Sequence, residues 1–194
     1  MARISIVKVG LEREVNAYVV ACAATRQAVV VDPGLPVEKL AAQVRPFDVR
    51  WIVATHGHPG HVAGKDDLKD LTGAETAMQI SDAKQFLRSA GRYLLDGDEL
   101  EFGDFRMRVL LTPGHTQGSL CLLVGNHLFT GDTLLAGGIG REMPGSDLRR
   151  QLVSIVTRLL PLPPTTAVYP GHGPVTSIGG EIASNPYLTG VAGA

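Results

Sequence analysis

Four strand-like runs of this 194-residue chain end directly in side chains of types that can bind metal ions. They are VRWIVAT before His56, His58 and His61, RVLLTPG before His115, HLFTG before Asp132, and AVYPG before His172. Strand ends in layered α/β folds are where binding sites assemble. We therefore expect a fold that brings these four strand ends to one place.

The rest of the chain alternates strands with helices. Strand-like runs at 4–9, 16–23 and 27–31 come first, and a segment with helical spacing follows at 37–47. Two further helices are expected, one at 61–73 that ends at Gly73 and one at 81–91 with Ser81 as its N-cap. The second half repeats this rhythm, with further strands and an amphipathic helix within 146–163. Strand-rich segments interrupted by helices, in two similar halves, predict two sheets flanked by helices.

Composition excludes several classes of protein. The formal net charge of -1 favours neither nucleic acid nor an anionic membrane as a partner, and no apolar run is long enough to cross a bilayer. The N-terminus lacks the pattern of a signal peptide, and the two cysteines, Cys22 and Cys121, are typical of buried free thiols. We expect one cytoplasmic domain over residues 1–190 and a loose tail at 191–194. The sequence does not specify an oligomeric state.

Imidazoles and a carboxylate together suit Zn²⁺, and also iron or manganese, better than Ca²⁺ or Mg²⁺. His56 and His58 are two residues apart, so in an extended segment they point the same way and can reach one ion. His61 lies where a helix can begin and turn it toward a neighbouring position. His127 sits beside a hairpin turn without an obvious partner, and we interpret it as an exposed structural residue.

These motifs resemble those of the metallo-β-lactamase-fold hydrolases, and the resemblance runs nearly end to end. It rests on VDPG ending at Gly34, the histidine cluster, TPGHTQGS (112–119), TGDTL (130–134) and YPGHGP (169–174). Within that superfamily, GDTLLAGGIGREMPGSD and YPGHGPVTSIGGEIASNPYL are most similar to glyoxalase II (hydroxyacylglutathione hydrolase) and its short bacterial relatives. The resemblance implies an α/β fold, a four-layer αββα sandwich with a two-metal site at one edge.

The resemblance also implies a role for each ligand. The first metal would take His56, His58 and His115, the second would take His61 and His172, and Asp132 would bridge both. A metal-bound water, acting with Asp132, would supply the hydroxide that attacks a thioester or a related ester of a small molecule.

Gly60 departs from the family motif His-x-His-x-Asp-His, because it occupies the aspartate position. The second ion therefore lacks a carboxylate ligand, and two divalent ions with one protein carboxylate repel each other. We expect one tightly bound Zn²⁺ and a second ion that is weak or absent. The sequence stops soon after NPYL, so we expect no helical domain of the kind with which glyoxalase II binds glutathione. Any such recognition is then expected from residues such as Arg141, which is equally interpretable as a structural arginine.

Three functions fit these residues. The first is a metal-dependent thioester hydrolase similar to glyoxalase II. The second is a mononuclear iron persulfide dioxygenase of the same fold, whose two-histidine, one-carboxylate set would be His56, His115 and Asp132. The third is a degenerate, non-catalytic member that binds a metal or a ligand, which only Gly60 favours.

Overall fold

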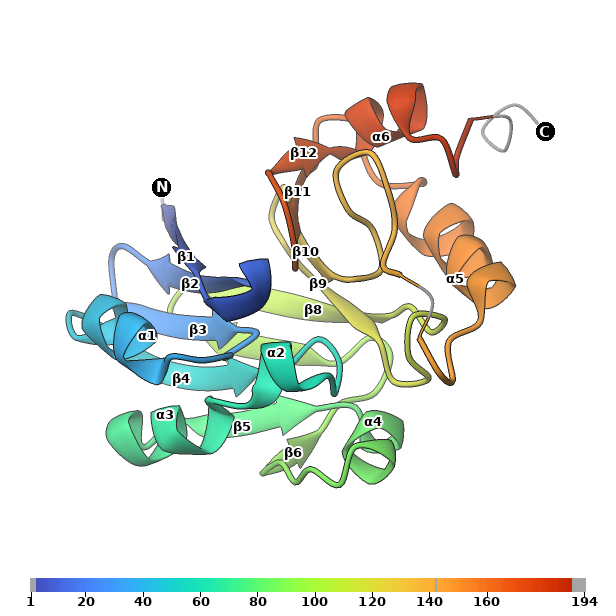
Figure 1. Cartoon of the computed structure of the whole chain (residues 1–194). Coiled ribbons are helices and arrows are strands. Elements are labelled where there is room, and N and C mark those ends of the chain that lie inside the picture. Colours follow the sequence, from blue (N-terminus) through green and yellow to red (C-terminus); the bar gives the residue numbers. More distant parts are fainter. Residues whose placement is uncertain (1–2, 142, 190–194) are drawn as a thin grey trace.

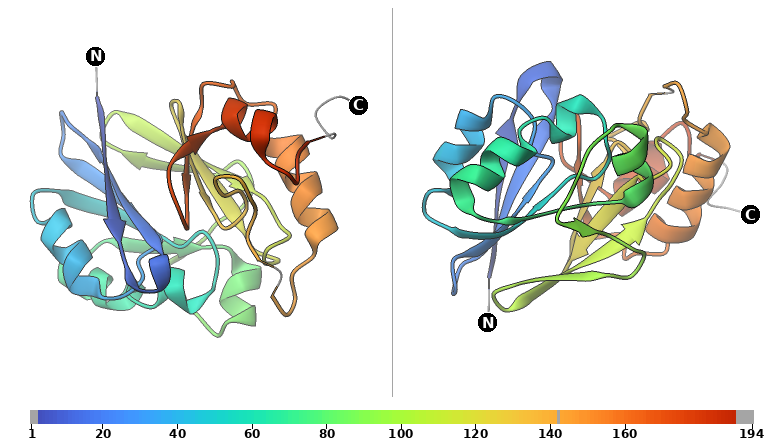
Figure 2. Two further views of the ribbon diagram at one scale, coloured as in Figure 1. Left: turned by 45° about the horizontal axis from the view of Figure 1, so that its top comes forward. Right: turned by 90° about the horizontal axis from the view of Figure 1, so that it is seen from below.

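The computed structural model of the chain describes residues 3–141 and 143–189. Two six-stranded sheets pack face to face, and helices cover their outer faces (Figures 1 and 2). This architecture confirms the four-layer αββα sandwich. The tail expected at 191–194 lies outside the described residues.

The first sheet has the strand order β1-β2-β3-β4-β5-β6. Its strands are β1 (Ile4–Gly10), β2 (Asn16–Cys22), β3 (Gln27–Val31), β4 (Asp48–Val53), β5 (Glu75–Met78) and β6 (Arg92–Tyr93). The first three strands pair antiparallel, whereas β3, β4, β5 and β6 pair parallel. The carboxyl ends of β3 and β4 therefore meet at one edge of this sheet.

The second sheet has the strand order β12-β11-β10-β9-β8-β7. Its strands are β7 (Glu99–Phe102), β8 (Phe105–Leu111), β9 (Leu120–Val124), β10 (His127–Gly131), β11 (Ala167–Pro170) and β12 (Thr176–Ser177). β9 is antiparallel to both β8 and β10, and β10 is parallel to β11. The strands β8, β10 and β11 thus run in one direction, and their carboxyl ends share an edge.

The helices form the outer layers of the sandwich. α1 (Val37–Val44) and α3 (Lys65–Thr72) cover the first sheet, whereas α5 (Leu148–Ser154), the π-helical turn η2 (Ile155–Leu159) and α6 (Ile178–Ser184) cover the second (Figure 1). Two short helices, α2 (Pro59–Val62) and α4 (Ile80–Gln85), follow the ends of β4 and β5, and the turn η1 (Glu12–Glu14) joins β1 to β2.

The helix boundaries test two of the sequence predictions. Gly73 ends α3 in the left-handed conformation, with φ 71°, as expected for a glycine at that position. The prediction that Ser81 caps α4 is wrong, because the cap is Gln79, whose side chain accepts a hydrogen bond from the Ser81 backbone N–H.

The main core lies between the two sheets. The rings of Tyr18 on β2 and Phe129 on β10 meet edge to face, with centroids 5.3 Å apart. The Tyr18 hydroxyl donates a hydrogen bond to the carbonyl of Pro170 at 2.7 Å, which ties the first sheet to the end of β11. Cys22 and Cys121 are buried free thiols, as predicted.

Within the described residues, no helix combines the length and the apolar character that crossing a membrane requires.

Replacement of Phe129 tests this core. Its ring is fully buried between the sheets, so Phe129→Ala leaves a cavity and is expected to lower the free energy of unfolding by about 3–5 kcal/mol. Leu71→Ala is the control, because Leu71 is 64% exposed and its loss is expected to cost less than about 1 kcal/mol. Chemical denaturation followed by circular dichroism measures both, and equal losses would contradict the assignment of the core.

Candidate metal centre

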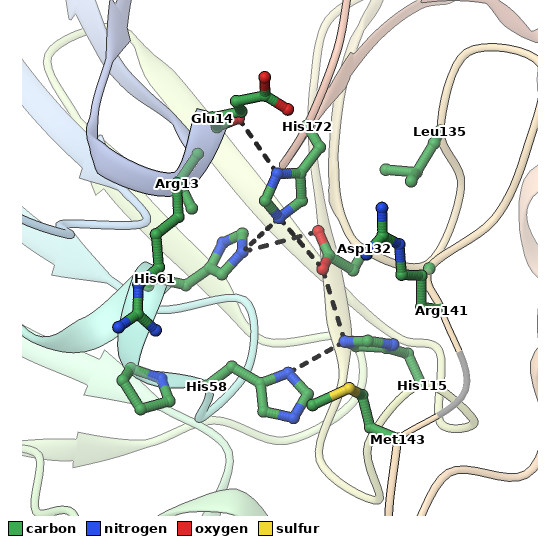
Figure 3. A pocket seen from close by; sticks show the side chains of 14 residues that line it. Arg13, Glu14, His58, His61, His115, Asp132, Leu135, Arg141, Met143 and His172 are labelled. Carbon is green, nitrogen blue, oxygen red and sulfur yellow. Dashed lines mark hydrogen bonds and ion pairs between the residues drawn. The ribbon is translucent and has the colours of Figure 1, made fainter.

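The carboxylate of Asp132 lies among four imidazoles where the two sheets meet, and Figure 3 shows three of them, those of His61, His115 and His172. One carboxylate oxygen, Oδ2, lies 3.5 Å from Nε2 of His115, 3.5 Å from Nε2 of His172 and 4.0 Å from Nε2 of His56. The other, Oδ1, lies 3.6 Å from Nε2 of His61. A side chain at the end of β10 thus contacts residues from three other segments.

The donor atoms form two overlapping groups, each small enough to surround one ion. His56, His58 and His115 make up one group, and Nδ1 of His58 lies 3.0 Å from Nε2 of His115. His56, His61 and Asp132 make up the other. His172 lies beside this second group, with its Nε2 3.4 Å from that of His61. The structure therefore gathers all six side chains that the strand ends pointed to.

His127 lies apart from this cluster, as expected, but the interpretation of it as an exposed residue without a partner is wrong. Its ring is partly buried, and its Nδ1 lies 3.1 Å from the hydroxyl of Tyr169 on the neighbouring strand β11. Tyr169 is 42 residues away in the chain, so only the strand pairing brings the two together.

The chain reaches the cluster through tight turns. Gly131 has φ 48°, and a Cβ there would lie 2.2 Å from Oγ1 of Thr55. Only glycine fits such a position, because it combines a left-handed backbone with close contact to a neighbour. β10 can therefore turn directly beside the end of β4 and bring Asp132 to the histidines.

Asp32, in the VDPG turn after β3, fixes the orientation of His61. Its Oδ1 accepts a hydrogen bond from the Thr55 backbone N–H at 2.7 Å, and its Oδ2 accepts one from the Thr55 hydroxyl at 2.9 Å. The same Oδ2 lies 3.0 Å from Nδ1 of His61. A hydrogen bond at Nδ1 leaves Nε2 of His61 free to face Asp132. Carboxylates commonly hold metal-binding histidines in this way, through the ring nitrogen that does not bind the metal.

Asp82 is a second organising carboxylate, and sequence reasoning missed it. It is fully buried on α4 and accepts hydrogen bonds from the backbone N–H groups of Gly57 at 2.7 Å and Gly118 at 2.6 Å, and from the Thr116 hydroxyl at 2.8 Å. These donors lie in the loops that carry His58 and His115. Asp82 therefore joins the two loops that present the first donor group.

Electrostatics gives His56, His115 and Asp132 the protonation states that a metal ion requires. Burial lowers the pKa of His56 well below its usual value, and burial also lowers the pKa of His115 to about 4, although Asp132 opposes both shifts. Burial raises the pKa of Asp132, but the hydrogen bond from His172 and the charges of His61 and His56 outweigh it and hold that pKa below its usual range. At neutral pH the imidazoles of His56 and His115 are neutral and the carboxylate is ionised. At His61, burial lowers the pKa but the neighbouring Asp32 outweighs it and raises the pKa, and the hydrogen bond to Asp132 raises the pKa of His172.

Two polar atoms of the cluster show that it suits a metal ion. Nε2 of His56 and Oδ1 of Asp132 are buried and have no hydrogen-bond partner within the described part of the chain. Unpaired buried polar atoms are costly, and a bound ion would satisfy both. Imidazole nitrogens with one carboxylate form a donor set for zinc, iron or manganese.

A cavity of about 530 Å³ opens over the cluster. Gly60 and Arg141 line it, so both residues singled out in the sequence face the site. Arg13, on η1, also lines the cavity, and sequence reasoning missed it. The sequence ERE does not indicate that Arg13 lines a cavity, because the position of Arg13 depends on the backbone path of η1.

Comparisons with known proteins agree with this geometry. The family model for the metallo-beta-lactamase superfamily matches residues 10–172. The hydroxyacylglutathione hydrolase GloC of Haemophilus influenzae is 33% identical, over 84% of this chain and 88% of that protein. The probable polyketide biosynthesis zinc-dependent hydrolase BaeB of Bacillus velezensis is 34% identical, over 80% of this chain and 71% of its own length.

Three solved structures are similar along nearly the whole chain. The BLEG-1 B3 metallo-beta-lactamase has a TM-score of 0.89 and 30% identity, covering 96% of this chain and 100% of that one. ETHE1 from Myxococcus xanthus has a TM-score of 0.85 and 32% identity, with coverages of 98% and 85%. TTHA1623 in a di-iron-bound form has a TM-score of 0.81 and 33% identity, with coverages of 94% and 100%.

The role of Asp82 yields a prediction. Asp82→Asn keeps the shape but turns one acceptor into a donor facing N–H or O–H groups, so we expect a loss of about 2–3 kcal/mol in the free energy of unfolding. Displaced loops should also weaken zinc binding by ~10-fold or more. Asp67→Asn, an exposed change on α3, is the control. Denaturation and zinc titration measure the effects, and wild-type values for Asp82→Asn would show that the loops do not need this carboxylate.

Proposed function

The chain belongs to the metallo-beta-lactamase superfamily, and we propose that it is a metal-dependent hydrolase that cleaves thioesters in the manner of glyoxalase II. The observation that carries this proposal is the cluster of five histidines and Asp132 at a cavity large enough for a small molecule. The name of the Haemophilus influenzae relative supports the choice of substrate.

Each residue of the cluster has a place in this proposal. A first ion would be held by His56, His58 and His115, and a second by His61 and His172, with Asp132 between them. A bound Zn²⁺ lowers the pKa of a water ligand toward neutrality and polarises the carbonyl that the water attacks.

The chain's own groups position the reactants. Asp132 is ionised, so its carboxylate accepts a hydrogen bond from the attacking water and orients it. The carbonyl of Asp132 is held by the Gly140 backbone N–H at 2.8 Å and by the Gln151 side-chain amide at 3.1 Å, which fixes this residue. Hydrolysis forms a C–O bond and breaks the C–S bond, and the thiolate that leaves takes up a proton.

Gly60 sets the expected metal content. It belongs to α2, between His58 and His61, and leaves the second donor group with Asp132 as its carboxylate. Two divalent ions close together need more negative charge than one carboxylate supplies. We propose that the protein holds one ion tightly and a second weakly.

One observation favours a second candidate function. His56, His115 and Asp132 form a compact two-histidine, one-carboxylate set, with Oδ2 of Asp132 4.0 Å from Nε2 of His56 and 3.5 Å from Nε2 of His115. Such a set suits a mononuclear iron oxygenase, here a persulfide dioxygenase.

Paired assays test the proposal. The purified protein, loaded with zinc or iron, is given S-lactoylglutathione, followed by thiol release, and glutathione persulfide, followed by oxygen uptake. We expect thioester cleavage without oxygen uptake. Oxygen uptake with glutathione persulfide, without thiol release from S-lactoylglutathione, would establish the dioxygenase instead. A metal-loaded protein that is inactive in both assays would indicate a binding protein.

His58→Ala provides the matched loss of function. It removes a donor of the first group, so we expect zinc affinity to fall by at least ~100-fold and hydrolysis to be lost. His127→Ala makes the same change outside the cluster and should retain both properties. Full zinc occupancy in His58→Ala would show that the first site is misassigned.

Gly60→Asp tests the metal content. Gly60 does not have a positive φ, and a Cβ there would lie 3.0 Å from Cγ2 of Val15, so a shift of a few tenths of an ångström admits the side chain. We expect metal content to rise from about one toward two ions per chain. Elemental analysis measures it, with Gly60→Asn as the uncharged control. A parent that already holds two ions at full occupancy would refute the missing-ligand argument.

A further inference from the structure

Arg13 stands in the wall of the cavity, on the turn η1. Its backbone is left-handed, with φ 55° and ψ 30°, and Glu14 after it is also left-handed, with φ 60°. Residues other than glycine adopt this conformation rarely, because it costs about 1–2 kcal/mol. This path of η1 places Arg13 on the cavity wall and the Glu14 carbonyl beside His172 (Figure 3).

Hydrogen bonds on both sides fix η1 relative to the metal cluster. Nδ1 of His172 lies 3.1 Å from the carbonyl oxygen of Glu14. The backbone N–H of Asn16 donates to the Gly171 carbonyl at 2.8 Å, and that of Glu12 donates to the Leu35 carbonyl at 3.0 Å. The backbone that carries Arg13 is thus attached to the loop that carries a metal donor.

Arg141 lines the same cavity from the opposite side of the cluster, as Figure 3 shows. Within the described residues, the ion pairs made by arginines involve four others, namely Arg50, Arg92, Arg106 and Arg158. Arg13 and Arg141 are not among them, so no carboxylate in the described part of the chain pairs with either guanidinium. A guanidinium binds carboxylates with two parallel hydrogen bonds, which makes each a site for an anionic group.

The rest of the cavity lining includes apolar side chains, among them Val15, Leu135 and Met143. A molecule that reaches from Arg13 to Arg141 crosses the metal donors that lie between them in Figure 3, meets a cation at each end and finds apolar contacts in the same cavity. That arrangement fits an elongated substrate that is charged at both ends and reacts in the middle.

We propose that Arg13 and Arg141 bind anionic groups at the two ends of one substrate, so that the favoured thioester carries a carboxylate on its acyl group as well as on its thiol carrier. This inference rests on the proposed thioester hydrolysis. Arg13 binds the acyl carboxylate and Arg141 binds the carrier. Water adds to the carbonyl, the C–S bond breaks, and a dicarboxylate and a thiol leave.

A matched pair of substrates tests the proposal. S-butanoylglutathione and S-succinylglutathione have four-carbon acyl groups and differ in the terminal carboxylate. With the zinc-loaded protein, the ratio of kcat/KM for succinyl over butanoyl should exceed one, and Arg13→Gln should lower that ratio about 10- to 100-fold, the effect of one lost charge-assisted hydrogen bond. Arg13→Lys should retain part of the preference, whereas Arg141→Gln should weaken both substrates alike.

Controls separate this inference from the proposed function. Arg45→Gln, an exposed change at the C-terminal end of α1, should leave the ratio unchanged. Calorimetry with the thioethers S-butylglutathione and S-(3-carboxypropyl)glutathione measures binding without hydrolysis, and Arg13→Gln should weaken only the second. If neither thioester is cleaved but this binding difference appears, the proposed reaction is wrong and the role of Arg13 stands. An unchanged ratio and unchanged binding in Arg13→Gln would overturn the inference.

Discussion

The buried carboxylate of Asp32 is the interaction on which the arrangement of the site depends. It is 1% exposed, and its two oxygens bind the backbone and hydroxyl of Thr55 and the ring of His61. A buried charge is costly unless hydrogen bonds satisfy it, so loss of any one of these three contacts would destabilise the turn. One residue thereby joins the ends of β3 and β4 to α2, and the orientation of His61 follows from the packing of the first sheet.

Asp82 joins two loops by hydrogen bonds, just as Asp32 joins the ends of two strands. Its three donors belong to the loops after β4 and β8, so the two halves of the first donor group are held by one buried carboxylate that is not part of the cavity lining. The site thus separates two tasks. Asp132 and four of the histidines line the cavity, while Asp32 and Asp82 fix the backbone behind them, which preorganises the donors before any ion binds.

The sequence predicted the sheets and the strand ends because these depend on local patterns. Apolar runs that stop at glycine and then histidine or aspartate are visible along the chain, and parallel strands bring their ends together. Asp82 was beyond that reasoning, because its backbone partners Gly57 and Gly118 lie 25 and 36 residues away. Arg13 was missed for a related reason, since its place on the cavity wall follows from a left-handed turn that no glycine marks. The positions of both side chains are determined by contacts between segments that are distant in the sequence.

The absence of a carboxylate at Gly60 would affect substrate binding as well as metal binding, because Gly60 and Arg13 line the same cavity. A carboxylate at position 60 would help to hold a second ion, but it would also place a negative charge on the wall where we propose that an anionic substrate binds. Unit charges ~6–8 Å apart in a partly buried site interact by about 2–3 kcal/mol, enough to offset much of the attraction that one arginine supplies. Glycine removes that repulsion, and the cavity keeps Asp132, among its histidines, as its central carboxylate. On these two proposals, weak binding of a second ion and attraction for an anionic acyl group would both follow from the same missing side chain.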